Sequence, residues 1–296
     1  MKRRVKIALG FLKECFDTLV SLVLILAFSR RVPSKSDAKR IEKIIILGNG
    51  PSLRNDLDAV VKRSGDKTTD ICAVNDFAFS DVFSDVRPSI YVLADPNYWM
   101  EGASAELNAR RLLLLNIFSE KVTWPMDVML PVEAKECPLF NGLASDFVTY
   151  SFYNRTPVSG FNWFRFRFFD YGLGMPPPFN VLIAAITLAI AKDYKKIFIL
   201  GADHSWHEEL TVANEKDVLV AQKHFYDNAV DRKPVYKEGS ETFTVGELFI
   251  RWGKVFKIYE ILALYASYKN AEVYNLSRKT YIDAFPRSNI EEFDNL

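Results

Sequence analysis

Residues 43–52 read KIIILGNGPS, and this stretch decides the fold. After one lysine it holds four consecutive large apolar residues, three of them isoleucine. A short continuous apolar run of this kind is typical of a strand that is buried on both faces of a parallel sheet. The Gly-Asn-Gly-Pro-Ser segment at 48–52 predicts a tight turn that leads from this strand into a helix.

Similar apolar runs recur along the chain, and each of them ends in polar residues. They occupy residues 70–74, 89–93, 196–200 and 272–274. Apolar helical stretches are expected at 180–192 and 245–268. Strands that alternate with helices predict an α/β fold with a doubly wound, mostly parallel sheet of the Rossmann type.

The polar residues at the strand ends are the first candidates for a binding site. Asn49 lies in the first turn, Asn75 follows the second strand, Asp95 the third and Asp203 the fourth. Ligands of doubly wound sheets bind outside the carboxyl ends of the strands, so we expect these residues to share one cleft. The turn at 48–52 matches neither GxGxxG nor GxxxxGK[ST], which excludes the usual dinucleotide and P-loop motifs.

The charge balance argues against a nucleic-acid partner. The 296 residues include 38 Lys plus Arg and 37 Asp plus Glu, which gives a net charge of +1. Nucleic-acid-binding domains carry a basic field that attracts phosphate, and no such overall excess exists here. We therefore expect the chain to bind no nucleic acid.

The cysteines and carboxylates do not form a metal-binding pattern. Cys15, Cys72 and Cys137 are far apart in sequence and show no CxxC spacing. No DxD motif follows a predicted strand, because Asp56 and Asp58 belong to the helix expected after the first turn. We expect a reducing compartment, no structural zinc and no bound metal or other cofactor.

Residues 1–31 predict an amphipathic helix that lies on a membrane. Its apolar side holds Leu9, Leu12, Phe16, Leu19, Val20 and Val23, and its polar side holds Lys6, Gly10, Lys13, Glu14, Asp17 and Ser21. Basic residues on both flanks suit an anionic cytoplasmic leaflet. A transmembrane anchor, a cleaved signal peptide, and a helix packed on the domain or on a second copy in a homo-oligomer are the alternatives.

The remainder is expected to be a linker at 32–40 and a single α/β domain at 41–296 with two insertions. The insertion at 151–178 contains alternating Phe and Arg at 164–168, which predicts an extended segment with Arg165 and Arg167 on one face. The insertion at 210–244 is polar and is expected to form a lid.

The strand ends resemble those of a known family. GNGPSL at 48–53, VNDF at 74–77, DP at 95–96 and IFILGAD at 197–203 look like the bacterial sialyltransferases of glycosyltransferase family 42. They are equally similar to a wider superfamily whose fold relative is the archaeal 6-hydroxymethylpterin diphosphokinase. The resemblance covers roughly residues 41–285 and implies a modified Rossmann, GT-A-like fold.

The resemblance also implies where a donor nucleotide binds. In the sialyltransferases the asparagines of the GNGPS turn and of the second strand end hold the CMP part of CMP-sialic acid. The positions carried over are Gly48, Asn49, Gly50, Pro51, Ser52, Asn75, Asp95, Asn180 and Gly201. Two of them depart from the family pattern, since Asp95 replaces an asparagine and Asn180 replaces a serine or threonine that precedes glycine.

The family's general base has no direct counterpart. Family members have a histidine just before the long C-terminal helix, whereas this chain reads EGSET at 238–242 and has no histidine after His224. The candidates are therefore Glu238 or Glu241, and His204 or His207 with Asp203 as the orienting group. For the leaving phosphate, the candidates are Tyr226 and Tyr236 in the lid and Arg165 and Arg167 in the other insertion.

Together with the N-terminal helix, the resemblance implies a membrane-associated bacterial glycosyltransferase on the cytoplasmic face of the inner membrane. It would transfer an acidic sugar, a sialic-acid-like nonulosonate or Kdo, from a CMP-sugar to a lipid-linked or surface glycan, with inversion and without metal. Such an activity would serve lipopolysaccharide or other surface polysaccharide biosynthesis. A magnesium- and ATP-dependent pyrophosphokinase and a non-catalytic membrane adaptor are the alternatives.

Overall fold

The computed structural model of the protein describes residues 2–32, 41–102, 104–141, 145–213, 217–221, 223–227, 232–237 and 241–296. Two of the features expected from the sequence fall outside these ranges. They are Glu238 and all but the first residue of the linker predicted at 32–40.

The central sheet confirms the predicted doubly wound α/β fold. Its described strands are β1 (Lys43–Leu47), β2 (Thr69–Val74), β3 (Ile90–Val92), β4 (Met126–Pro131), β5 (Val148–Tyr153), β6 (Lys196–Leu200) and β10 (Glu272–Asn275). All neighbours pair in parallel, in the order β10-β6-β1-β2-β3-β4-β5. In this register Ile45 of β1 lies between Ile71 of β2 and Phe198 of β6. The order reverses between β1 and β6, and this is the topological switch point at which such sheets bind ligands.

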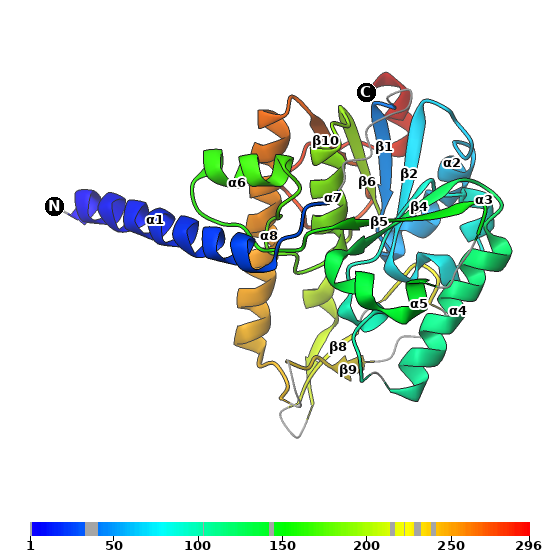
Figure 1. Ribbon diagram of the computed structural model, residues 1–296, viewed down its shortest axis with the longest axis horizontal. Coiled ribbons are helices and arrows are strands. Elements are labelled where there is room, and N and C mark those ends of the chain that lie inside the picture. Colours follow the sequence, from blue (N-terminus) through cyan, green and yellow to red (C-terminus); the bar gives the residue numbers. More distant parts are fainter. Residues whose placement is uncertain are drawn as a thin grey trace.

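Helices cover both faces of the sheet (Figure 1). One face carries α6 (Asn162–Asp170), α7 (Val181–Ala191) and α8 (Val245–Tyr268), and the other carries α2 (Leu57–Val61), α3 (Phe83–Val86) and α4 (Ala105–Lys121). The short α5 (Pro138–Asn141) follows β4. Helix α7 reads VLIAAITLAIA, and a helix that is apolar on all sides must be buried. Accordingly it packs between the sheet and α8.

The second predicted insertion contains a small antiparallel sheet. It consists of β7 (Leu210–Val212), β8 (Val218–Ala221) and β9 (Arg232–Pro234) and lies beyond the carboxyl ends of β1 and β6 (Figure 1). Val218 and Val220 of β8 pack on Leu248 of α8 and thereby attach this sheet to the main domain. We call residues 210–237 the lid.

Helix α1 (Lys2–Phe28) extends away from the body of the protein (Figure 1). Its second half contacts the body: the Ser21 hydroxyl accepts a hydrogen bond from the Ser159 amide at 2.9 Å, and both Ser21 and Ile25 are buried. The part of the predicted polar side in the second half of the helix, from Glu14 to Ser21, therefore faces the protein, while Lys6, Gly10 and Lys13 are exposed. The predicted apolar side is solvent-exposed, and its residues Leu9, Leu12, Phe16, Leu19 and Val23 are each 61–66% accessible. No helix in the described part of the chain is both long enough and apolar enough to span a bilayer.

Three local predictions require correction or completion. The segment at 164–168 is part of helix α6 and is not extended, because Phe164 and Phe168 lie one helical turn apart and pack together at 4.6 Å. Arg165 and Arg167 therefore do not share a face. The turn at 48–52 leads first into a 3-10 helix, Pro51–Asn55, and only then into α2. Strands β4 and β5 were not anticipated.

Candidate functional site

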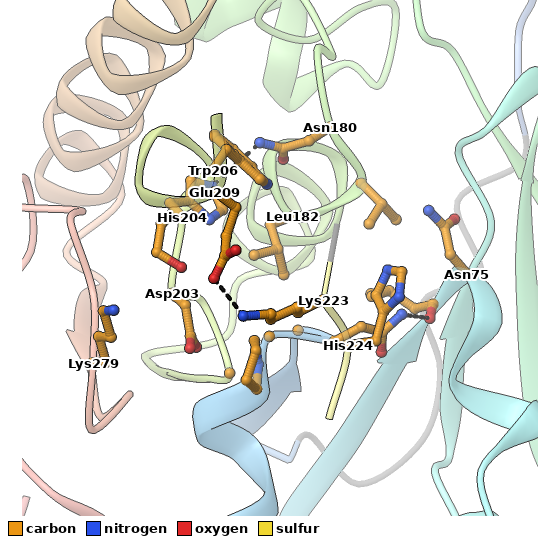
Figure 2. Close-up of a pocket in the computed structure, with 18 of the residues that line it drawn as sticks. Asn75, Asn180, Leu182, Asp203, His204, Trp206, Glu209, Lys223, His224 and Lys279 are labelled. Carbon is orange, nitrogen blue, oxygen red and sulfur yellow. Dashed lines mark hydrogen bonds and ion pairs between the residues drawn. The ribbon is translucent and has the colours of Figure 1, made fainter. Parts of the chain in front are cut away.

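A cavity of about 360 Å³ lies at the switch point between β1 and β6. The turn after β1, the ends of β2 and β6, the start of α7 and part of the lid line it. Its volume falls within the range of about 300–1,000 Å³ that is common for small-molecule sites. Figure 2 shows Asp203 and Lys279 on one side of this cavity and Asn75 on the other. We call it the switch-point cavity.

Three glycines bring two backbone segments into contact at the floor of this cavity. The Gly50 amide donates to the Gly201 carbonyl at 2.8 Å. A Cβ atom on Gly48 would lie 2.5 Å from the same carbonyl oxygen, and a Cβ on Gly50 would lie 2.4 Å from Asp203. Gly201 itself has φ +64°, a left-handed conformation that glycine adopts without strain. These glycines therefore allow the close approach of the two strand ends.

Asp203 joins the same two segments through its side chain. Its carboxylate accepts the Ser52 hydroxyl at 2.5 Å and the Ser52 amide at 3.0 Å. Burial raises the pKa of Asp203, while the bonds from Ser52 favour its ionised form. The amides of Gly50 and Ser52 are thus used within the fold and are not directed at an anion. Side chains must supply most of the recognition in this cavity.

The two asparagines expected to hold a nucleotide both line the switch-point cavity. Asn49 donates from Nδ2 to the Val74 carbonyl at 3.2 Å. Its Oδ1 is buried and has no hydrogen-bond partner among the described residues. Asn75 accepts the Ala94 amide at 3.2 Å and has φ +46°. A buried acceptor without a partner is costly, so Asn49 is set up to receive a donor from a ligand.

Asn180 and His204 also reach this cavity, but their polar atoms are largely engaged by the fold. Asn180 caps α7 by accepting the Ile183 amide at 3.0 Å, and it donates to the Tyr259 hydroxyl at 3.1 Å. The His204 Nε2 lies 2.7 Å from the same hydroxyl. Burial lowers the pKa of His204 to about 3, so its ring stays neutral. The ring joins β6 to α8 and is poorly placed to act as a base.

Ionisable side chains from the lid and from other segments also line the cavity, and the sequence had not singled them out. Lys223 forms an ion pair with Glu209 at 2.5 Å in the middle of the cavity (Figure 2). Lys279 lies at the edge and pairs with Glu208. His224 lies beside Lys223, on the side of Asn75 (Figure 2). The lining of the cavity therefore includes two lysines, two histidines and three carboxylates, those of Asp203, Glu208 and Glu209.

His224 is held in a defined orientation by Asp227. The Asp227 carboxylate lies 2.9 Å from His224 Nδ1 and also accepts the His224 amide at 2.8 Å. The ring of His224 stacks on Tyr226 with 5.1 Å between centroids. The Phe225 amide donates to the Asn49 carbonyl at 3.0 Å, which fixes the segment to the turn after β1. A His-x-x-Asp spacing at 224–227 was the available sequence signal for this pair.

A second cavity, of about 470 Å³, lies next to the first and shares His224 with it. Tyr226 and Tyr236, expected to contact a leaving phosphate, line this second cavity and not the switch-point cavity. Asp76 and Arg110 lie opposite them and form an ion pair at 2.7 Å.

The other predicted site residues lie apart from both cavities, as far as the described chain shows. Asp95 caps a 3-10 turn by accepting the Asn97 amide at 2.9 Å. His207 packs edge-on against Tyr281, and Glu241 is exposed and pairs with Lys237 at 3.6 Å. Arg165 and Arg167 are on α6, where Arg165 contacts Asn162 and Arg167 contacts Tyr171. Within the described ranges no group of three or more His, Cys, Asp or Glu side chains is placed to hold a metal ion.

Among the solved structures that are similar to this chain is the MAf glycosyltransferase from Magnetospirillum magneticum AMB-1. The two superimpose with a TM-score of 0.51 at 15% sequence identity, over 89% of this chain and 36% of that chain. The chain thus spans about a third of the length of that protein, and the likeness shows a common fold. No protein-family model matches the chain, and no curated protein matches it.

Proposed function

We propose that the protein is a glycosyltransferase that takes an acidic sugar from a CMP-sugar and binds the nucleotide in the switch-point cavity. The observation that carries this proposal is the buried Oδ1 of Asn49 at the carboxyl end of β1, which has no hydrogen-bond partner in the part of the chain that the structure describes. The amino group of a cytosine or a ribose hydroxyl would supply the missing donor. The resemblance of the strand ends to bacterial sialyltransferases and the fold shared with a glycosyltransferase both support this assignment.

Two lysines supply the charge that such a donor requires, Lys223 from the lid and Lys279 from the segment after β10. Lys223 and Lys279 face a cavity whose ligand would carry a phosphate and a carboxylate. Glu209 and Glu208 hold the two ammonium groups in place until the ligand arrives. Fixed cations at a departing phosphate stabilise the charge that develops in the transition state. We therefore assign the phosphate contact to Lys223 and propose that transfer needs no metal and no other cofactor.

A magnesium-dependent phosphoryl transferase fits these residues less well. Asp203 lines the cavity, and both of its oxygens accept hydrogen bonds from Ser52, while Glu209 and Glu208 are paired with Lys223 and Lys279. Asp95, the other strand-end carboxylate, lies outside the cavity. The adaptor alternative predicts no nucleotide binding at all.

We expect CMP to raise the melting temperature of the full chain, with or without a metal chelator. At about 100 times its Kd a ligand adds about 2.7 kcal/mol, which corresponds to several degrees for a domain of this size. Asn49→Ala removes the buried acceptor and should lower the affinity for CMP at least about tenfold, which corresponds to about 1.4 kcal/mol of binding free energy. Differential scanning fluorimetry with CMP, CDP, UDP, GDP and ATP, each with and without magnesium, measures both effects.

The matched control is Asn116→Ala, which truncates an exposed asparagine on α4 and should leave the CMP response unchanged. Stabilisation by ATP only in the presence of magnesium would replace this proposal with phosphoryl transfer. No response to any nucleotide would favour the adaptor.

We also propose that α1 attaches the enzyme to the cytoplasmic face of the inner membrane, where its acceptor is a lipid-linked or surface glycan. A surface helix normally turns its apolar side toward the core, whereas α1 leaves its apolar side exposed and contacts the protein through the face that holds Ser21. Arg3, Arg4 and Lys6 at its start are exposed and complement an anionic leaflet. This orientation suits a helix that lies in the membrane surface.

The double variant Leu12→Glu/Phe16→Glu is expected to abolish binding to vesicles that contain anionic lipid. Each substitution would remove about 1.5–3 kcal/mol of binding free energy from apolar burial, which lowers the affinity for the vesicles at least about tenfold. Leu112→Glu/Leu113→Glu is the control, because these leucines are also half-exposed but lie on α4. Vesicle co-sedimentation measures the binding. Equal binding of both double variants would refute attachment through α1.

A further inference from the structure

The second cavity has the features of a binding site and no role in holding the donor nucleotide. It is formed by the end of β2, the helix α4 and the lid, and His224 separates it from the switch-point cavity. The Nδ1 atom of His224 is bound to Asp227, so Nε2 is the ring nitrogen that can face a ligand. A ligand in either cavity would therefore approach the same imidazole ring.

The charges of the second cavity are balanced. Asp76 pairs with Arg110, and Asp227 and Lys233 supply one further charge of each sign. The Arg110 guanidinium also lies over the ring of Phe79, 4.4 Å from its centroid. The lining of the second cavity therefore presents both signs of charge. It offers both hydrogen-bond donors and acceptors, as a neutral ligand with many hydroxyl groups requires.

Two tyrosines complete this arrangement. The hydroxyl of Tyr226 is buried and finds no partner among the described residues. Burial raises the pKa of Tyr226, so the hydroxyl keeps its proton and can donate it to a ligand. Tyr236 is 58% exposed at the mouth of the cavity, where an aromatic ring can cover the apolar face of a pyranose.

We propose that the second cavity is the acceptor subsite and binds a neutral pyranose, with one hydroxyl directed at Nε2 of His224. This inference rests on the proposed donor site in the first cavity. In the transfer step the acceptor O–H bond breaks and its proton passes to Nε2. A new bond forms between that oxygen and the anomeric carbon, while the bond from the anomeric carbon to the phosphate oxygen breaks. The electron pair leaves on the CMP phosphate, beside Lys223.

The test uses methyl β-galactoside and methyl β-glucoside as probes, because they lack the alkyl tail that would bind the exposed side of α1. Saturation-transfer NMR on the full chain with CMP present reports both ligands at once. Wild type should transfer saturation to a glycoside, and Tyr236→Ala should reduce that signal at least about fivefold without changing the CMP signal. Tyr171→Ala is the control, since Tyr171 is 56% exposed but lies beyond α6, outside both cavities.

A second variant separates ligand contact from structural damage. Tyr226→Phe removes a buried hydroxyl that has no partner in the described structure, so it should not lower the melting temperature. It should nevertheless weaken the glycoside signal. Three results would overturn the proposal. The glycoside signal could remain intact in both variants, or it could be absent in wild-type protein that binds CMP. The third such result is displacement of the glycoside by inorganic phosphate. If the protein binds a glycoside through Tyr236 but does not bind CMP, the second cavity is still a sugar site and the assignment of the donor nucleotide to the first cavity is wrong.

Discussion

Gly201→Ala is expected to destabilise the protein by about 3 kcal/mol and to abolish its response to CMP. The substitution would hold alanine in a left-handed conformation, at a cost of about 1–2 kcal/mol. Its Cβ would also lie 2.5 Å from the Gly48 carbonyl oxygen and 2.9 Å from the Leu53 Cβ. Overpacking of this kind costs about 1–3 kcal/mol because backbone must move. That movement would separate the turn after β1 from the end of β6 and displace Asn49.

Urea unfolding of the full chain measures this loss, and fluorimetry with CMP measures the second effect. Gly253→Ala provides a control of opposite sign. Gly253 is inside α8, and no atom of the described residues lies within 4 Å of the place that a Cβ atom would take, so alanine should stabilise the helix by about 0.5–1 kcal/mol. If Gly201→Ala unfolds at the wild-type urea concentration, the close contact between the two strand ends does not constrain the fold.

The switch point was predictable from the sequence because it depends on local patterns. Strands β1 and β6 are buried on both faces and therefore read as continuous apolar runs, IIIL at 44–47 and IFIL at 197–200. Strand β5 reads VTYSFY and has an exposed threonine, since it lies at the edge of the sheet. The alternation of buried and exposed residues in this strand is therefore hard to distinguish, in the sequence, from the aromatic segment that follows. The Phe and Arg residues at 164–168 fit both a strand and a helix, and packing against α8 decides between them.

The candidate site was predictable only in part, because local sequence patterns place only some of its residues. Asn49, Asn75 and Asp203 follow from their places at strand ends. The burial of His204 depends on Tyr259, which is 55 residues away on α8. The position of His224 depends on two long-range contacts, from the Phe225 amide to Asn49 and from Arg54 to the Phe225 carbonyl. Contacts of this kind leave no local pattern in the sequence.

His224→Asn is expected to reduce transfer by about 10²–10⁴-fold, the usual contribution of a general base. The acceptor hydroxyl would have no group to receive its proton at the boundary of the two cavities. The CMP-induced rise in melting temperature should persist, because Asn49, Asn75 and Lys223 remain. Release of CMP from CMP-N-acetylneuraminate or CMP-Kdo, with a methyl glycoside present, measures the rate.

Two companion variants test whether the effect belongs to the pair His224–Asp227. Asp227→Asn should lower the same rate, since the carboxylate fixes the tautomer that leaves Nε2 able to accept a proton. His207→Asn should leave it unchanged, because His207 packs on Tyr281 and lines neither cavity within the described chain. The opposite pattern, with activity lost in His207→Asn and kept in His224→Asn, would place the proton transfer outside the boundary between the cavities. It would then remove the reason for linking the second cavity to the acceptor.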